Sequence, residues 1–290
     1  MLRLFADTDC DITPKEAEQY GFTLISMPYV EDGNLIRPYV DWNEFDAHAF
    51  YDRLRGGQLP STCALSPADY VSYFEPVFAA GDDILYVHFS SGMSSTFNAM
   101  RLALDELKEK YPERKFYDID TLLISIGGYA MATEIGKLYK KGATGEEIVA
   151  WAEKEREHFA VYFFAEDLKF FGRSGRVSGL TATMGNLIGI KPIINMNSNG
   201  VMDSVDKARG TKNCISKVLD YVERLGENMK DYPVYIASAD CDALAERLKQ
   251  AFVERFGEGH EIHLVTVNPT IGSHCGPDCT GVCFRAKTRE

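Results

Sequence analysis

The chain has 290 residues, of which 45% are hydrophobic, so it can form one large domain or two ordinary domains around a sizeable packed core. Its formal net charge of -12 excludes a broad nucleic-acid surface and disfavours an acidic membrane, because clustered lysine and arginine hold both of these partners. No apolar run approaches the roughly 20 residues that span a bilayer, and the first residues lack a signal-peptide core, so the sequence predicts a cytoplasmic protein without stable membrane insertion.

Short apolar runs alternate with amphipathic segments over the first 160 residues. This alternation is typical of βα units around a mainly parallel sheet. Capping residues Thr13, Ser66 and Thr144 each predict the start of a helix. Strands are expected at residues 2–6, 23–28, 83–89 and 115–119, and further helices at residues 43–55, from the serines after residue 90 to about residue 110, and at 126–140.

The second half of the chain has a different pattern. Residues 191–195 and 201–205 flank a turn of hairpin composition at residues 197–200, which predicts an antiparallel pair of strands. Further strands are expected at residues 159–165, 233–239 and 261–267, and helices at 211–225 and 242–256. The sequence thus predicts an α/β protein with an N-terminal α/β domain at residues 1–160 and a smaller, mixed-sheet C-terminal α/β domain at residues 161–290.

Hydroxyl side chains are concentrated in two turns. Ser94 and Ser95 lie between an expected strand and an expected helix, where hydroxyls and free helix N–H groups can converge on a carboxylate or a phosphate. The alternative is that either serine only caps the helix. Thr62 lies in a second polar turn, where it is a ligand contact or an ordinary turn residue that bonds its own backbone.

Three cationic or ionisable side chains could also contact an anion. Arg173 and Arg176 lie in an expected glycine-bearing loop at residues 170–178, and arginine is well suited to oxygen anions, although both side chains could simply lie on the surface. His274 follows the expected strand at residues 261–267 in a turn. Its imidazole can hydrogen-bond an anion, and the alternative is a polar surface residue without a specific partner.

The sequence gives no support for a metal or a cofactor. Seven cysteines without an export signal favour reduced thiols. Cys275, Cys279 and Cys283 lie near His274, but their spacing is not that of two CxxC pairs, and glycine and proline interrupt the segment. The chain also lacks GxxxxGK[ST], GxSxG and HExxH motifs and a GxGxxG motif after the first strand, so neither a nucleotide nor another cofactor is expected.

The order of motifs along nearly the whole chain resembles that of the DegV family. Four segments are similar to its D-S-x-x-D-L, T-S-Q-P-S-P, K-G-G-R-I-S and I-G-x-H-x-G-P motifs, namely residues 7–12, 62–67, 172–178 and 271–277. Residues 89–96 resemble a segment that ends in L-S-G-T, with Ser94 at its serine, and residues 191–193 match K-P-I. Cys63, Ala64 and Ser95 depart from the family pattern.

This resemblance implies a two-domain DegV-like fold and a bacterial protein that binds a long-chain fatty acid. Thr62, Ser94 and His274 would hold the carboxylate, with Ser95 beside them, and Arg176 would organise the site or contact the partner. That partner would be a separate fatty acid kinase, which forms an acyl phosphate for phospholipid metabolism. The chain itself would not be an enzyme.

The acyl tail would enter the second domain. Residues 159–164 and 184–194 are candidates for its channel, and ordinary packed core is the alternative for both segments.

A second hypothesis is a serine esterase or thioesterase. It assigns Ser94 as the nucleophile, His274 as the base and an acid such as Asp7 as the residue that orients the base. This mechanism requires Ser94 and His274 to lie within hydrogen-bonding distance, and the GxSxG motif that exposes a catalytic serine is absent. A purely structural protein is a third possibility, but it leaves the ordered polar motifs unexplained.

Overall fold

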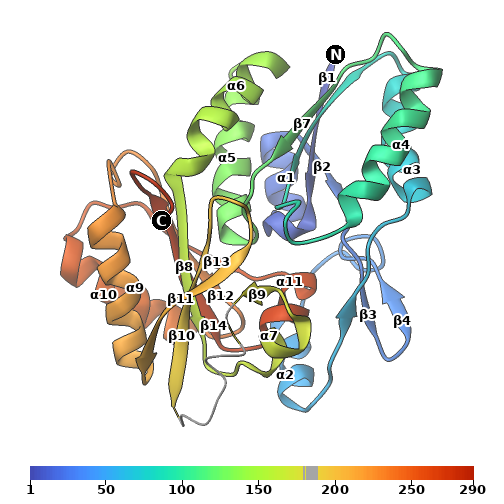
Figure 1. Cartoon of the computed structure of the whole chain (residues 1–290). Coiled ribbons are helices and arrows are strands. Elements are labelled where there is room, and N and C mark those ends of the chain that lie inside the picture. The colour runs from blue at the N-terminus through green and yellow to red at the C-terminus, as the bar shows by residue number, and fades with distance from the viewer. Residues whose placement is uncertain (179, 181–188) are drawn as a thin grey trace.

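The computed structural model of the chain describes residues 1–178, 180 and 189–290, and their strands form three sheets. The first half of the chain contains a four-stranded sheet and a small three-stranded sheet, whereas the second half contains a seven-stranded sheet (Figure 1). No helix in this described part of the chain has both the length and the apolar character needed to cross a membrane.

The four-stranded sheet is entirely parallel, as predicted, with the order β2-β1-β6-β7. Helices cover both of its faces: α3 and α4 pack on one side and α1, α5 and α6 on the other (Figure 1). This double cover explains why its central strands are nearly continuous apolar runs. The strands are β1 (Leu2–Asp7), β2 (Phe22–Ile25), β6 (Asp83–His88) and β7 (Phe116–Asp120).

Three helices of this half begin at the predicted capping residues Thr13, Ser66 and Thr144. In each case the cap side chain accepts the third helical N–H, and the acid at that position bonds back to the cap. The helices are α1 (Pro14–Tyr20), α3 (Pro67–Ala79), α4 (Thr96–Lys110), α5 (Ile126–Lys140) and α6 (Gly145–Glu155).

The small antiparallel sheet was not predicted. Its strands, β3 (Tyr29–Glu31), β4 (Asn34–Ile36) and β5 (Ser61–Thr62), have only two or three residues each, which is too short for a recognisable alternation of apolar residues. The helix predicted at residues 43–55 begins later, as α2 (Ala47–Arg55), because the Asp46 side chain accepts the N–H of Ala49 and so caps the helix there.

The seven-stranded sheet is mixed, as predicted, with the order β13-β12-β14-β8-β10-β11-β9. Among its described strands, only the pairs β12–β13 and β9–β11 are parallel. Helices α9 (Thr211–Leu225) and α10 (Asp242–Phe256) pack on its outer face, and α5 packs on its inner face. The strands are β8 (Phe159–Ala165), β9 (Val177–Ser178), β10 (Ile190–Met196), β11 (Met202–Arg209), β12 (Val234–Ser238), β13 (Ile262–Thr266) and β14 (Cys279–Arg285).

Two elements of the second half correct the sequence prediction, and a third was not predicted. The expected loop at residues 170–178 begins as a helix, α7 (Lys169–Ser174), and ends as β9. His274 lies in the last turn of a helix, α11 (Pro269–Cys275), rather than in a turn, because Asn268 caps the helix by accepting the N–H groups of Thr270 and Ile271. The cysteine-bearing C-terminal segment forms β14, which lies inside the sheet between β12 and β8.

The two large sheets share a hydrophobic core. Its buried residues include side chains from β1 and β6 as well as from the inner faces of β8, β12 and β14. Helix α5 lies between the sheets, and Gly127 allows its close approach, because a Cβ atom there would come within 2.8 Å of Val161 on β8. The strands of the four-stranded sheet all lie before residue 121, and the described strands of the seven-stranded sheet all lie after residue 158. The domain boundary at residue 160 stays a prediction.

A tight contact joins the two halves near the serine loop that follows β6. Gly200, in the β10–β11 turn, has a φ of +72°, and its carbonyl accepts the hydroxyl of Ser90 at 2.5 Å. A Cβ atom at Gly200 would overlap the Ser90 hydroxyl and come within 2.9 Å of Leu122. A larger residue therefore cannot be accommodated without moving the two halves apart.

We predict that Gly200→Ala lowers the free energy of unfolding by about 3 kcal/mol, since it combines left-handed backbone strain with steric overlap. Gly33→Ala is the matched control, because Gly33 has a φ of +79° but open space around it, and its cost should be about 1 kcal/mol. Urea unfolding measures both values. Equal losses for the two variants would contradict the proposed contact.

Candidate functional site

A cavity of about 320 Å³ lies between the two halves of the chain. This volume is within the range of small-molecule binding sites. Apolar side chains of β8, Val161 and Phe163, form part of its wall together with Ile124 and Ile126 at the start of α5. The five residues proposed from the sequence all line the cavity as well: Thr62, Ser94, Ser95, Arg176 and His274.

Thr62 and His274 are hydrogen-bonded to each other, although they lie 212 positions apart in the sequence. The bond joins Oγ1 of Thr62, on β5, to Nε2 of His274, on α11, over 2.9 Å. A neutral imidazole carries one N–H and the hydroxyl one O–H, and their mutual bond uses only one of these two protons. Whichever tautomer is present, the pair keeps one donor for a ligand.

His274 is neutral at physiological pH. Burial lowers its pKa to about 4, and the positive charges of Arg176 and Arg173 act in the same direction. Its Nδ1 atom is buried and has no hydrogen-bond partner among the described residues. A buried polar atom without a partner lowers the stability of the protein unless a ligand or water bonds to it. The neutral imidazole can therefore contact an anion through a hydrogen bond and need not be charged.

Ser94 and Ser95 lie between β6 and α4, but they make different local contacts. The Ser94 hydroxyl oxygen accepts the N–H of Thr96 at 3.2 Å and so satisfies a backbone donor at the start of α4. Its O–H is still able to donate to a ligand. Ser95 is the N-cap residue of α4 and makes no side-chain capping bond. Both hydroxyls can therefore donate to a ligand at the polar end of the cavity.

The two arginines near the cavity differ in role. Arg173, to which the family resemblance assigned no role, donates to the backbone carbonyls of Leu59 and Pro60 and so holds the segment that leads into Thr62. Arg176 is exposed and donates to the carbonyl of Ser174 at 2.7 Å. Both guanidinium groups favour an anion near His274.

An open groove adjoins the polar end of the cavity. Its lining includes Ser94, Ser95 and Arg176, which it shares with the cavity, and Arg101 and Asn98 on the exposed face of α4. We call this surface the polar groove. Arg101 could not be singled out from the sequence, because an arginine on an amphipathic helix ordinarily faces solvent without a specific role.

Only some of the residues expected to form a tail channel line the cavity. Along β8, Val161 and Phe163 line the cavity, whereas Ala160, Tyr162 and Phe164 point into the other core, as alternation along a strand requires. Of the second candidate segment, residues 184–188 lie outside the described residues, and residues 189–194 are not part of the cavity wall. Met196 and Met202 line it instead.

The geometry does not form the catalytic triad of the esterase hypothesis. Within residues 1–178, 180 and 189–290, His274 bonds Thr62 and makes no hydrogen bond with Ser94. The carboxylate of Asp7 accepts from Phe89, Tyr86 and Asp9 and does not orient the imidazole. A histidine with a pKa near 4 is also a weak general base at neutral pH.

The C-terminal cysteines do not form a metal centre in the described structure. Burial raises the pKa of the Cys283 thiol to about 12, and a hydrogen bond with Cys275, together with burial, raises that of Cys279. Among the described residues, these cysteines do not gather with other cysteine, histidine or acidic side chains into a group of three or more possible metal ligands. Cys275 and Cys279 line the cavity instead.

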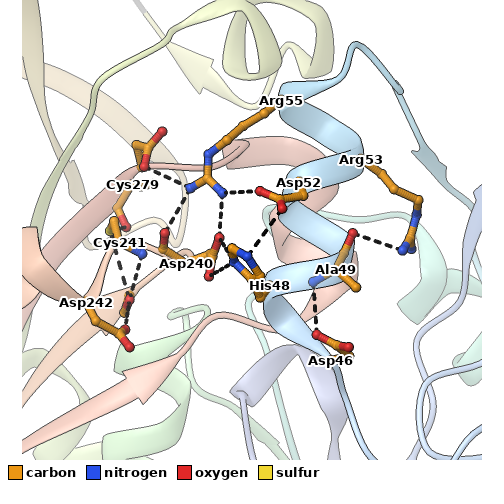
Figure 2. Close-up of polar contacts among 12 residues, drawn as sticks. Asp46, His48, Ala49, Asp52, Arg53, Arg55, Asp240, Cys241, Asp242 and Cys279 are labelled. Carbon is orange, nitrogen blue, oxygen red and sulfur yellow. Dashed lines mark hydrogen bonds and ion pairs between the residues drawn. The ribbon is translucent and has the colours of Figure 1, made fainter.

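One other group of side chains, His48, Asp52 and Asp240, has the spacing of metal ligands among the described residues. Figure 2 shows that the guanidinium of Arg55 already reaches its two carboxylates. Arg55 Nη1 lies 2.5 Å from Asp240 and 3.1 Å from Asp52. The positive charge of Arg55 disfavours a metal ion at this position. The side chains instead form a set of ion pairs that joins α2 to the loop after β12.

The fold and the cavity define an α/β protein with two large sheets and one small sheet, which encloses a pocket with a mostly apolar wall and a polar end. A sequence model of the DegV family, described as a family of uncharacterised proteins, matches residues 1–287. The chain therefore belongs to the DegV family, as the motif order predicted.

Individual relatives match over nearly their whole lengths. A DegV domain-containing protein of Clostridium perfringens is 29% identical over 287 residues, which are 99% of this chain and 98% of the relative. The structure is similar to that of a DegV family protein from Thermus thermophilus described as binding fatty acid, with a TM-score of 0.85, 24% identity and coverage of 98% and 99%. It is also similar to DegV, a fatty acid binding protein from Bacillus subtilis, with a TM-score of 0.82, 23% identity and coverage of 99% of each chain.

We predict that His274 in the ligand-free protein stays neutral from pH 8 to about pH 5 and takes up a proton near pH 4. The unfolded chain protonates this residue near pH 6.5, so the stability difference between the wild type and His274→Gln should fall by up to about 3 kcal/mol as the pH drops from 6.5 to 4. NMR titration of the imidazole and urea unfolding measure the two effects. A titration midpoint near pH 6.5 would contradict the buried, neutral state.

Proposed function

We propose that this protein binds one long-chain fatty acid, with the carboxylate near Thr62, Ser94, Ser95 and His274 and the tail inside the cavity. The observation that carries the proposal is the neutral Thr62–His274 pair, with its one spare donor, at the polar end of a cavity lined mostly by apolar side chains. The fatty-acid-binding relatives from Thermus thermophilus and Bacillus subtilis support it. So does a relative from Eubacterium ventriosum described as binding stearic acid.

The tail and the head group contribute differently to affinity. Burial of about 15 methylenes at roughly 0.8 kcal/mol each gives a gross gain near 12 kcal/mol, much of which association and ordering offset. The carboxylate adds little net energy, but leaving it unpaired in the interior costs several kcal/mol. The hydroxyls and the imidazole therefore fix the direction and register of the ligand, while the apolar wall provides most of the affinity.

We further propose that the bound carboxylate is presented to a separate fatty acid kinase. The polar groove opens to solvent beside Ser94 and Ser95, so a second protein could reach a carboxylate held there. Transfer of the terminal phosphoryl group of ATP to this carboxylate would yield an acyl phosphate and ADP. Arg101 and Arg176 would favour an approaching anionic phosphate, and this chain would supply binding and position rather than catalytic groups.

We predict that Thr62→Val and Ser94→Ala each weaken stearate binding about tenfold, because each removes a hydroxyl from the polar end while keeping the side-chain size nearly constant. Isothermal titration of delipidated protein measures the change. Thr23→Val is the matched control, since Thr23 is an exposed strand residue on β2. Unchanged affinity in both site variants would show that the carboxylate does not bind at this end of the cavity.

The kinase step is tested with Arg101→Glu. We expect stearate affinity to stay within about twofold of the wild type, because Arg101 lines the groove and not the cavity. The rate of acyl phosphate formation with ATP and a bacterial fatty acid kinase should fall at least about tenfold, as expected for a charge reversal at a docking surface. Lys108→Glu, the same charge reversal on an exposed position of α4, is the control. Equal rates for the two variants would exclude docking at this groove.

A further inference from the structure

Asp9 places a carboxyl group without a partner on the wall of the cavity. It lies just after β1 in the short turn η1 (Thr8–Cys10), and its side chain is 5% exposed. Its backbone is fixed on both sides, because its N–H donates to Asp7 and its carbonyl accepts the N–H of Ser125. Asp9 is one of the residues that line the cavity, and its buried Oδ1 atom has no hydrogen-bond partner in the part of the chain that is described.

The two neighbouring acids are satisfied within the protein. Asp7 accepts from Phe89, Tyr86 and Asp9, and Asp11 accepts from the Ser125 hydroxyl and from Asn268. Of the three acids, Asp9 alone faces the cavity. A structural role like that of its neighbours therefore leaves its free oxygen unexplained.

The surroundings of Asp9 oppose the charged form of its carboxyl group. Burial raises its pKa well above the usual value, and the nearby Asp7 and Asp11 carboxyls act in the same direction. A protonated carboxyl offers one O–H donor and an acceptor oxygen but does not repel a fatty acid carboxylate electrostatically. The wall thus presents a hydrogen-bonding group whose surroundings favour its protonated form, in a cavity whose lining also includes the apolar Ile124 and Ile126.

A simple alkyl chain cannot satisfy this group, whereas a hydroxyl on the chain can both donate to it and accept from it. We propose that Asp9 is a specificity-determining residue that favours fatty acids bearing a hydroxyl group on the tail. The inference rests on the proposed fatty-acid function and adds a substrate class to it. Asp9 stands at an unspecified position of the D-S-x-x-D-L motif, so this preference would belong to this chain rather than to the motif.

The test compares stearate with a series of stearic acids hydroxylated at successive positions along the tail. Each is titrated into delipidated wild type, Asp9→Leu and Asp9→Asn. In the wild type at least one isomer should bind about tenfold more tightly than stearate, because a hydrogen bond then replaces an unpartnered buried group. Asp9→Leu should bind stearate at least as well as the wild type and lose the preference, while Asp9→Asn, which keeps a donor and an acceptor, should retain part of it.

A second measurement does not depend on the Leu variant folding. The infrared C=O band of the protonated Asp9 carboxyl, assigned by its loss in Asp9→Asn, should shift when the preferred hydroxystearate binds and not when stearate binds. If every isomer binds no better than stearate, or the band does not respond, an ordered water satisfies Asp9 and the inference fails. Failure of stearate itself to bind would instead overturn the proposed function.

Discussion

The hydrogen bond between Thr62 and His274 is the constraint on which the rest of the site depends. It connects the small sheet of the first half to a helix near the C-terminus, at the polar end of the cavity. Burial and two arginines keep the imidazole uncharged, so the pair offers hydrogen bonding without the cost of a buried charge. A ligand with one small anionic end and a long apolar end matches this arrangement.

The two halves of the chain contribute different kinds of side chain to the cavity. The inner face of the seven-stranded sheet supplies apolar wall, including Val161 and Phe163. The loops at the carboxyl ends of parallel strands supply polar groups: Asp9 follows β1, Ser94 follows β6 and Ser125 follows β7. Ligand sites of open parallel sheets are typically found at these strand ends. The shared core around α5 holds the apolar wall and the polar loops in a fixed relative position.

The parallel sheet and its helices could be predicted because their strands are continuous apolar runs and their helices begin at local capping signals such as Thr13 and Thr144. β14 could not, since its glycine and cysteines resemble a loop, and its place between β12 and β8 depends on distant partners. Thr62 and His274 are individually ordinary residues, and only the motif order suggested pairing them. Asp9 was missed because exposure to an internal cavity is not encoded in local sequence.

A crystal structure of the protein with stearate bound would test the proposed site. We predict one carboxylate oxygen within roughly 3 Å of the Thr62–His274 pair and another near Ser94 or Ser95, with the tail along Val161, Phe163 and Met196. A ligand that lies in the reverse direction, or that binds only on the surface with the cavity empty, would contradict this placement.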